Sequence, residues 1–221
     1  MTLPCQHVAD HSPKVETCLV RLGDTIGLEH NQNMRIHFIR HCPVIKDATT
    51  PAETWQLAPG ASKMEQALHA ELMRIDFDCV ISSPESKALK TAERLLGKDH
   101  PVELDERLRE LQRPGYIEDY QAQVAAVFEA PGIQINGWES AAACQERSMA
   151  ALTELLEKRR SQILLFGHGL HGALLRALCL GQSLAELSDW AAINSPDLMI
   201  LDMAASGQLT MVEDFRGIAS N

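Results

Sequence analysis

Apolar and polar positions alternate along the chain in blocks that predict strands and helices in turn. Residues 34–39 and 77–81 are short apolar-rich runs of strand length, and residues 163–166 form a continuous apolar run. Between these runs, apolar side chains recur at helical spacing. This pattern predicts helices over residues 61–75, 84–96, 116–130, 139–160 and 170–180, with closing strands at 198–201 and 209–212.

Strands that alternate with helices predict an α/β fold, because each helix carries the chain back to start a parallel neighbour. We therefore expect a three-layer sandwich, with a mainly parallel central sheet and helices on both faces. Residues 1–33 are polar and contain two prolines and one small apolar group at 18–20. They are interpreted as an N-terminal extension, and residues 34–221 as one domain.

The second helix has the clearest boundaries. Ser83 is a good N-cap and Pro84 suits the first helical position, where its missing N–H costs no hydrogen bond. Gly97 follows the last apolar pair and is a natural end for a helix.

Composition narrows the class of protein. The 221 residues are 45% hydrophobic and 23% charged, as in an ordinary globular domain, and the net charge of -10 argues against nucleic acid or an anionic membrane as the main partner. Six cysteines occur without any CxxC pair, so neither a zinc site nor a disulfide scaffold is indicated. No apolar run approaches the ~20 residues of a membrane span. We expect a soluble, cytoplasmic protein, and its oligomeric state stays open.

Polar residues follow three of the predicted strands. Arg40-His41, Ser82-Ser83 and Gly167-His168-Gly169 each stand where a strand gives way to a loop or helix. In parallel sheets, ligands bind beyond the carboxyl ends of the strands. The three groups are therefore expected to converge on one pocket.

The adjacent His41 and Cys42 are both competent nucleophiles toward phosphorus. A cysteine phosphatase of the protein tyrosine phosphatase kind needs an arginine six positions after its cysteine, where this chain has Ala48, and Pro43 lacks the N–H that such a loop needs. Without a cationic partner a thiol keeps a pKa of ~8.5 and stays mostly protonated. Neutral imidazole attacks directly, so the sequence favours His41 and assigns Cys42 to packing.

The chain resembles the histidine phosphatase superfamily, also called phosphoglycerate-mutase-like, from residue 34 to about 201. The pieces that carry the resemblance, in order, are Arg40-His41, Ser82-Ser83-Pro84-x-x-Lys87-Ala88-x-x-Thr91-Ala92, Leu108-Arg109-Glu110, Gly137-Trp138-Glu139-Ser140 and Gly167-His168-Gly169. No single motif is decisive. The four motifs other than Gly137-Trp138-Glu139-Ser140, occurring in the correct order, are fairly specific.

The resemblance implies three catalytic residues. His41 would form a phosphohistidine, His168 would hydrogen-bond the phosphoryl oxygens, and Glu110 would protonate the leaving group and then activate water. A solvated face is the alternative for Glu110, because residues 103–110 are dense in charge. No metal and no cofactor are implied.

The resemblance also implies a phosphate-binding set of Arg40, Lys87 and Gly169, with a small phosphorylated molecule as substrate. Lys87 stands where the family has a second arginine, and a point charge does not replace a planar fork. Cys42 replaces a usual glycine, and Asp47 replaces a frequent asparagine.

Several alternatives stay open at this stage. Arg107, Arg109 and Arg113 are candidates for the missing guanidinium, and Tyr116, Tyr120, Phe128 and Trp138 are candidates for a pocket wall. Hydrolysis is favoured over phosphoglycerate-mutase-type transfer, because no long substrate loop of the mutase kind is recognisable after Glu110. The substitutions at Cys42, Asp47 and Lys87 leave a catalytically weak phosphate-binding or interaction protein as a third hypothesis.

Overall fold

A six-stranded sheet forms the centre of the fold in the computed structural model, which describes residues 33–220. The strands are β1 (Met34–Arg40), β2 (Cys79–Ser82), β3 (Glu103–Leu104), β4 (Gln162–Gly167), β5 (Asp197–Met203) and β6 (Leu209–Glu213). The predicted extension over residues 1–33 lies outside the described residues, except for Asn33, and its separation from the domain stays a prediction.

Within the described residues, seven α-helices accompany the strands. They are α1 (Lys63–Leu72), α2 (Ser86–Leu96), α3 (Tyr120–Glu129), α4 (Ala141–Glu157), α5 (Gly169–Cys179), α6 (Leu187–Ala192) and α7 (Arg216–Ala219), with short 3₁₀ turns η1 (Ala52–Thr54) and η2 (Glu106–Leu108). Within residues 33–220, no helix is both long and apolar enough to cross a membrane.

The strand order is β3-β2-β4-β1-β5-β6. β1 pairs in parallel with β4, β4 with β2 and β2 with β3, whereas β5 and β6 add an antiparallel edge. The mainly parallel sheet predicted from the sequence is therefore confirmed.

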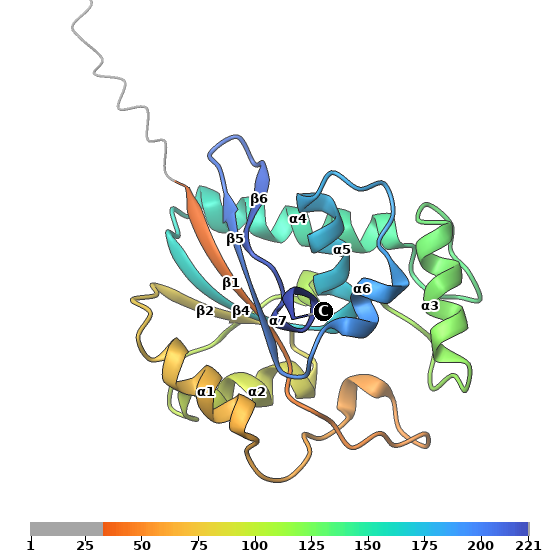
Figure 1. Ribbon diagram of the computed structural model, residues 1–221, viewed down its shortest axis with the longest axis horizontal. Helices are drawn as coiled ribbons and strands as arrows, with labels where there is room; N and C mark the ends of the chain where they lie inside the picture. Colours follow the sequence, from red (N-terminus) through yellow and green to blue (C-terminus); the bar gives the residue numbers. More distant parts are fainter. Residues whose placement is uncertain (1–32, 221) are drawn as a thin grey trace, which may run out of the picture. The chain divides into compact units, whose positions relative to one another are not determined.

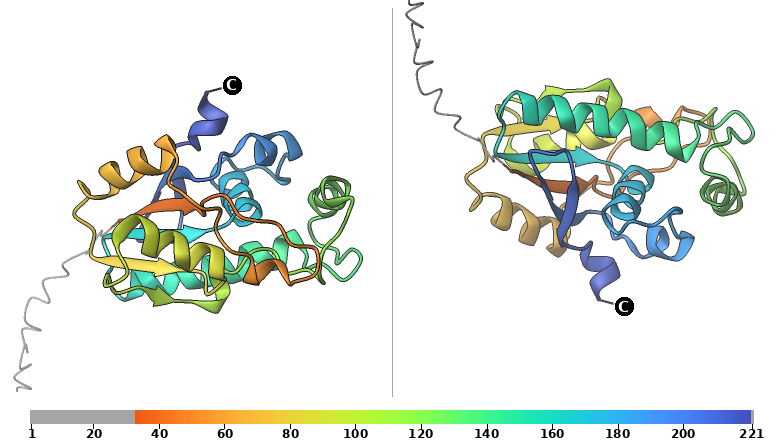
Figure 2. Two further views of the ribbon diagram at one scale, coloured as in Figure 1. Left: turned by 90° about the horizontal axis from the view of Figure 1, so that it is seen from below. Right: turned by 90° about the horizontal axis from the view of Figure 1, so that it is seen from above.

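Helices cover both faces of this sheet (Figure 1). Successive side chains of a strand point to opposite faces, so Phe38 of β1 packs in the core that contains α4 and α5, and Ile39 packs in the core that contains α1 and α2. Leu165 and Leu164 of β4 divide in the same way. The two views in Figure 2 place α1 and α4 on opposite sides of the strands, which confirms the three-layer sandwich.

The helix starts differ from the sequence prediction by one to four residues. α2 begins at Ser86 rather than at Pro84, and its N-cap is Glu85 rather than Ser83. α3 begins at Tyr120, because the Asp119 side chain caps the N–H of Ala122. The strand β3 and the short helices α6 and α7 were not predicted. These elements are too short for periodicity to reveal them.

Gly172 of α5 lies where the helix meets two aromatic rings. A Cβ at this position would lie 2.7 Å from Phe215 Cζ and 2.9 Å from Phe38 Cε1. We expect Gly172→Ala to lower the free energy of unfolding by about 1–3 kcal/mol, as overpacking does. Urea unfolding measures the difference.

Gly132→Ala is the matched control, because no heavy atom lies within 4 Å of the Cβ it would introduce. Its effect is expected to stay within about 0.5 kcal/mol. Equal stabilities for the two variants would show that the rings yield and that α5 is not closely packed here.

Candidate active site

The carboxyl ends of β1, β4 and β2 bring the candidate residues together. Arg40 at the end of β1 pairs with Gly167 at the end of β4, and Ser82 of β2 pairs with Phe166. The N–H of His41 donates to the carbonyl of Gly167 over 3.0 Å. The three polar groups predicted to converge do so, because their strands are direct neighbours.

Hydrogen bonds that involve the backbone fix the position of His41. Its Nδ1 lies 2.7 Å from the carbonyl oxygen of Cys42. A carbonyl oxygen can only accept, so Nδ1 carries the proton and Nε2 keeps the lone pair. The hydroxyl of Ser195 donates to the His41 carbonyl over 2.7 Å, which fixes the backbone on the other side.

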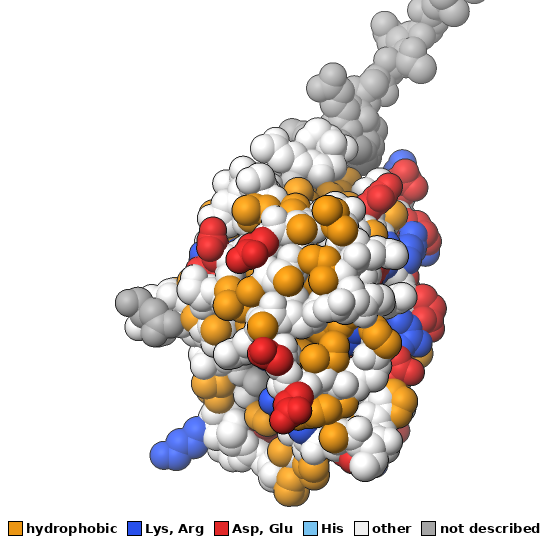
Figure 3. Space-filling model, turned by 90° about the vertical axis from the view of Figure 1, so that its right-hand side faces the viewer, with side chains coloured by type: hydrophobic (Ala, Val, Ile, Leu, Met, Phe, Trp, Pro, Cys, Tyr) orange, Lys and Arg blue, Asp and Glu red, His pale blue; other side chains and the backbone are white. Residues whose placement is uncertain are grey.

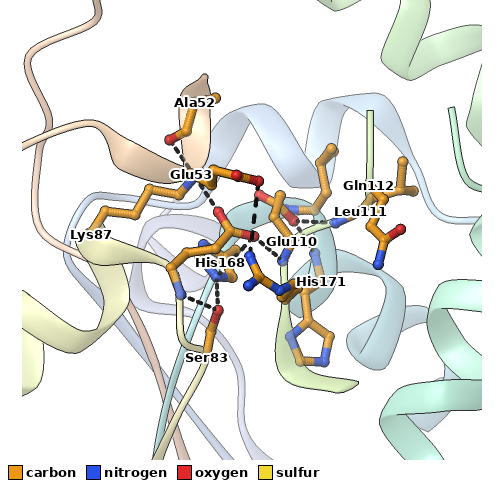
Figure 4. A network of polar contacts seen from close by, with 12 residues as sticks. Ala52, Glu53, Ser83, Lys87, Glu110, Leu111, Gln112, His168 and His171 are labelled. Carbon is orange, nitrogen blue, oxygen red and sulfur yellow. Dashed lines mark hydrogen bonds and ion pairs between the residues drawn. The ribbon is translucent and has the colours of Figure 1, made fainter. Parts of the chain in front are cut away.

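His168 faces His41 with 5.5 Å between ring centroids and 64° between ring planes. Its Nε2 lies 2.8 Å from Ser83 Oγ, and the ring is fully buried. The sequence predicted Ser83 as the N-cap of α2, and this prediction is wrong. The Ser83 hydroxyl instead orients the ring of His168. Figure 4 shows the two side chains directed at each other.

Both imidazoles are neutral near pH 7. Burial lowers the pKa of His41 to about 3, and the positive charges of Lys87, Arg40 and Arg113 lower it too. Burial likewise holds the pKa of His168 well below its usual value. A neutral ring keeps the lone pair that nucleophilic attack requires.

The Arg40 side chain packs directly against Gly169. The Arg40 guanidinium donates to the carbonyls of Ile193 and Asn194, which anchors it beside His41. A Cβ on residue 169 would lie 3.0 Å from Arg40 Cζ. Gly169 thus lets the guanidinium lie on the first turn of α5, and it contacts Arg40 rather than lining the cavity.

Glu110 is buried, which rules out the solvated face considered above. Its Oε1 accepts N–H bonds from His171 (3.0 Å) and Leu111 (3.1 Å), and Oε2 accepts from Leu170 (3.4 Å). Its carboxylate therefore sits at the N-terminus of α5, where the helix dipole favours negative charge.

Lys87 is paired with a carboxylate that the sequence analysis did not identify. Its Nζ lies 2.7 Å from Glu85 Oε2 and 3.1 Å from the carbonyl of Ala52 (Figure 4). Glu85 Oε1 accepts the N–H of Glu110 over 2.8 Å and lies 3.8 Å from His168 Nε2. The signal available in the sequence was an acidic residue two positions before Lys87.

Two of the substitutions singled out in the sequence lie away from the cavity. Cys42 is fully buried, and desolvation with the nearby Glu65 raises the pKa of its thiol to about 12. Its backbone N–H donates to Thr91 Oγ1 over 2.9 Å. Cys42 is therefore protonated near pH 7 and does not act as a thiolate. The carboxylate of Asp47, the second of these substitutions, accepts two hydrogen bonds from Thr49.

A cavity of about 340 Å³ opens in front of His41. It is lined by four cations, one carboxylate and three aromatic rings: Arg40, Lys46, Lys87, Arg113, Glu110, Trp55, Tyr120 and Trp190. His168 is fully buried and is not among the lining residues. Residues 33–220 contain no group of three histidine, cysteine or acidic side chains that could hold a metal ion.

Of the four aromatic residues considered for a pocket wall, Tyr120 lines the cavity. Trp138 and Phe128 are buried in the core, and Tyr116 is half exposed. The end of the molecule that carries α3 shows many hydrophobic side chains with scattered carboxylates among them (Figure 3). Trp55 and Trp190 were missed, because nothing in their local sequence links them to the strand ends.

A family model described as the histidine phosphatase superfamily (branch 1) matches residues 36–212. No curated protein matches the sequence. The match includes every residue of the site described above.

Solved structures with the same fold include two phosphatases and a mutase. A mycobacterial glucosyl-3-phosphoglycerate phosphatase is 20% identical, with 82% of this chain and 98% of that chain covered and a TM-score of 0.59. A phosphoglycerate mutase from Bacillus anthracis is 18% identical (86% and 96% covered, TM-score 0.64). A phosphoserine phosphatase variant from Entamoeba histolytica is 16% identical (83% and 98% covered, TM-score 0.58). At these identities the likeness concerns the fold.

The neutral state of the buried histidines is testable by NMR of histidine-labelled protein. We expect the His41 ring signals to show no titration between pH 5 and 8, because its pKa lies at about 3. In urea-unfolded protein the same ring should titrate with a pKa of ~6.5. Protonation of His41 thus favours the unfolded chain. The stability that comes from keeping this ring neutral is fully present above pH ~6.5 and is lost as the pH falls toward about 3.

Assignment of the His41 signals can come from a His41→Asn variant. A midpoint between pH 6 and 7 for His41 in the folded protein would contradict the burial and charge arrangement described here.

Proposed function

Since the chain belongs to the histidine phosphatase superfamily (branch 1), we propose that it is a metal-independent phosphomonoesterase that works through a phosphohistidine at His41. One observation carries the proposal. The His41 ring lines a cation-rich cavity with its proton held on Nδ1, so Nε2 is the nitrogen with a free lone pair. The substrate is a small phosphorylated molecule.

In the first step, His41 Nε2 attacks phosphorus and the bond from phosphorus to the ester oxygen breaks. Glu110, in its protonated form, donates a proton to the departing oxygen and is left as a carboxylate, and Arg40 with the other cations of the cavity wall offsets charge on the phosphoryl oxygens. In the second step, Glu110 takes a proton from water, which attacks the phosphohistidine. Inorganic phosphate leaves and His41 regains its lone pair.

His168, whose ring faces that of His41, supports the same step. Its ring is neutral and its orientation is fixed by Ser83, so it can present a hydrogen bond to a phosphoryl oxygen without adding charge. The aromatic rings of Trp55, Tyr120 and Trp190 line the same cavity, and we expect them to contact the organic part of the ester.

A phosphate-binding protein with weak catalysis is the second candidate. It is favoured by the ion pair between Lys87 and Glu85, which offsets one of the charges expected to grip phosphate. Binding of inorganic phosphate without turnover across a panel of phosphoesters would support it. Product analysis with 3-phosphoglycerate separates hydrolysis from mutase-type transfer, since the proposal expects free phosphate.

Removal of the nucleophile separates the histidine mechanism from the cysteine mechanism. We expect His41→Ala to lower kcat/KM for p-nitrophenyl phosphate by on the order of 10³-fold or more. Cys42→Ala should stay within about threefold of the wild type, because its thiol is protonated and buried. Full activity in His41→Ala together with loss in Cys42→Ala would reject the proposal.

The proton-donor role of Glu110 predicts a dependence on the leaving group. Glu110→Gln is expected to lower kcat by about 10²–10⁴-fold for an alkyl phosphate, whose leaving oxygen needs a proton. The loss should be much smaller for p-nitrophenyl phosphate, whose leaving group is stable as an anion.

Glu106→Gln is the matched control for this experiment, because the Glu106 side chain is exposed in the same charged stretch. Thermal unfolding of both variants separates catalysis from loss of the Glu110 contacts to α5. An equal loss on both esters would remove Glu110 from the proton-transfer step.

A further inference from the structure

The cluster of arginines after β3 divides into two that are paired and one that is not. Arg107 Nη2 lies 2.6 Å from Asp105 Oδ2 and 2.7 Å from Glu154 Oε2, and Arg109 donates to the Glu106 carboxylate. Arg113 has no hydrogen-bond or ion-pair partner anywhere in the described part of the chain. Among these three guanidiniums, Arg113 keeps its N–H groups available.

Arg113 is nevertheless held in place. Its Cζ lies 4.9 Å from the ring centroid of Tyr120 and 5.5 Å from that of Trp138. A guanidinium that stacks on a ring uses its flat face and leaves its edge donors free. Arg113 lines the same cavity as His41, and its positive charge contributes to the lowered pKa of His41 and of His168.

Lys87, in contrast to Arg113, already has partners for its charge and its N–H groups. Its side chain and that of Glu85 are both buried, at 4% and 6% exposure, and the ion pair between them measures 2.7 Å. A second N–H of Lys87 is taken by the carbonyl of Ala52. A phosphate group that approached Lys87 would also approach the Glu85 carboxylate, and this like-charge repulsion offsets much of the attraction.

On the basis of the proposed phosphatase function, we infer that Arg113 supplies the second guanidinium that grips the phosphoryl group, and that Glu85 retains Lys87 chiefly as a buried ion pair. Arg113 comes from the segment between η2 and α3 rather than from α2. Its planar fork donates two parallel hydrogen bonds to phosphoryl oxygens, which the single ammonium of Lys87 does not do.

Binding of inorganic phosphate, measured by calorimetry at fixed pH and ionic strength, tests the inference without requiring turnover. We expect Arg113→Gln to weaken binding by about tenfold or more, and Arg113→Lys to recover only part of the loss because it restores charge without the fork. Lys87→Gln should weaken binding less than Arg113→Gln. Arg109→Gln, the matched control with a paired guanidinium, should stay within about twofold.

A combined variant gives the most specific readout. In the Arg113→Gln background, Glu85→Gln releases the charge of Lys87 and should tighten phosphate binding by about threefold or more. Loss of packing at Arg113 alone would not be repaired in this way. Thermal unfolding checks that each variant is folded. If Arg113→Gln does not fold, Arg113→Lys is used as the background in its place.

The inference is overturned if Arg113→Gln and Arg113→Lys bind phosphate as the wild type does while Lys87→Gln abolishes binding. Failure of the catalytic proposal can be distinguished from failure of this inference. A wild-type protein that binds phosphate through Arg113 but forms no phosphohistidine would keep this assignment and lose the mechanism.

Discussion

The hydrogen bond from the His41 ring to the carbonyl of Cys42 decides what the rest of the site can do. It places the ring proton on Nδ1 and the lone pair on Nε2. The bond depends in turn on the backbone after β1, which is tied to Gly167 and to Ser195. The proposed nucleophile is thus fixed by main-chain geometry at the end of a parallel strand, and the side chains of the site surround an atom that is already in place.

The charges of the site follow from the cost of burying them. A buried cation or anion without a partner is strongly destabilising, so Lys87 is paired with Glu85 and Glu110 accepts three N–H bonds at the start of α5. The histidines meet the same constraint by staying neutral. Arg113 is the exception, because it lies at the cavity wall and rests on aromatic rings while its donors stay free.

The fold and the framework of the site were predictable from the sequence because both depend on local signals. Apolar runs marked β1, β2 and β4, and polar residues immediately after them marked Arg40, His41 and His168. Parallel pairing then places those strand ends side by side. The match of the family model agrees with the motifs that suggested the family.

The remaining features depend on partners far away in the chain. Ser83 carries the local signature of an N-cap, and only the position of His168, 85 residues later, shows that its hydroxyl is used elsewhere. Lys87 cannot be recognised as paired without the side-chain direction of Glu85. The choice among three nearby arginines likewise depends on Glu154 and on the rings of Tyr120 and Trp138.

The most direct test of this account is to identify the atom that is phosphorylated. Rapid quenching at alkaline pH during turnover of a phosphate ester, followed by proteolysis and phosphorus NMR of the labelled peptide, reports both the residue and the ring nitrogen. The account predicts phosphate on Nε2 of His41. Phosphate on Nδ1 of that ring, on another residue, or on none during measurable hydrolysis would contradict it.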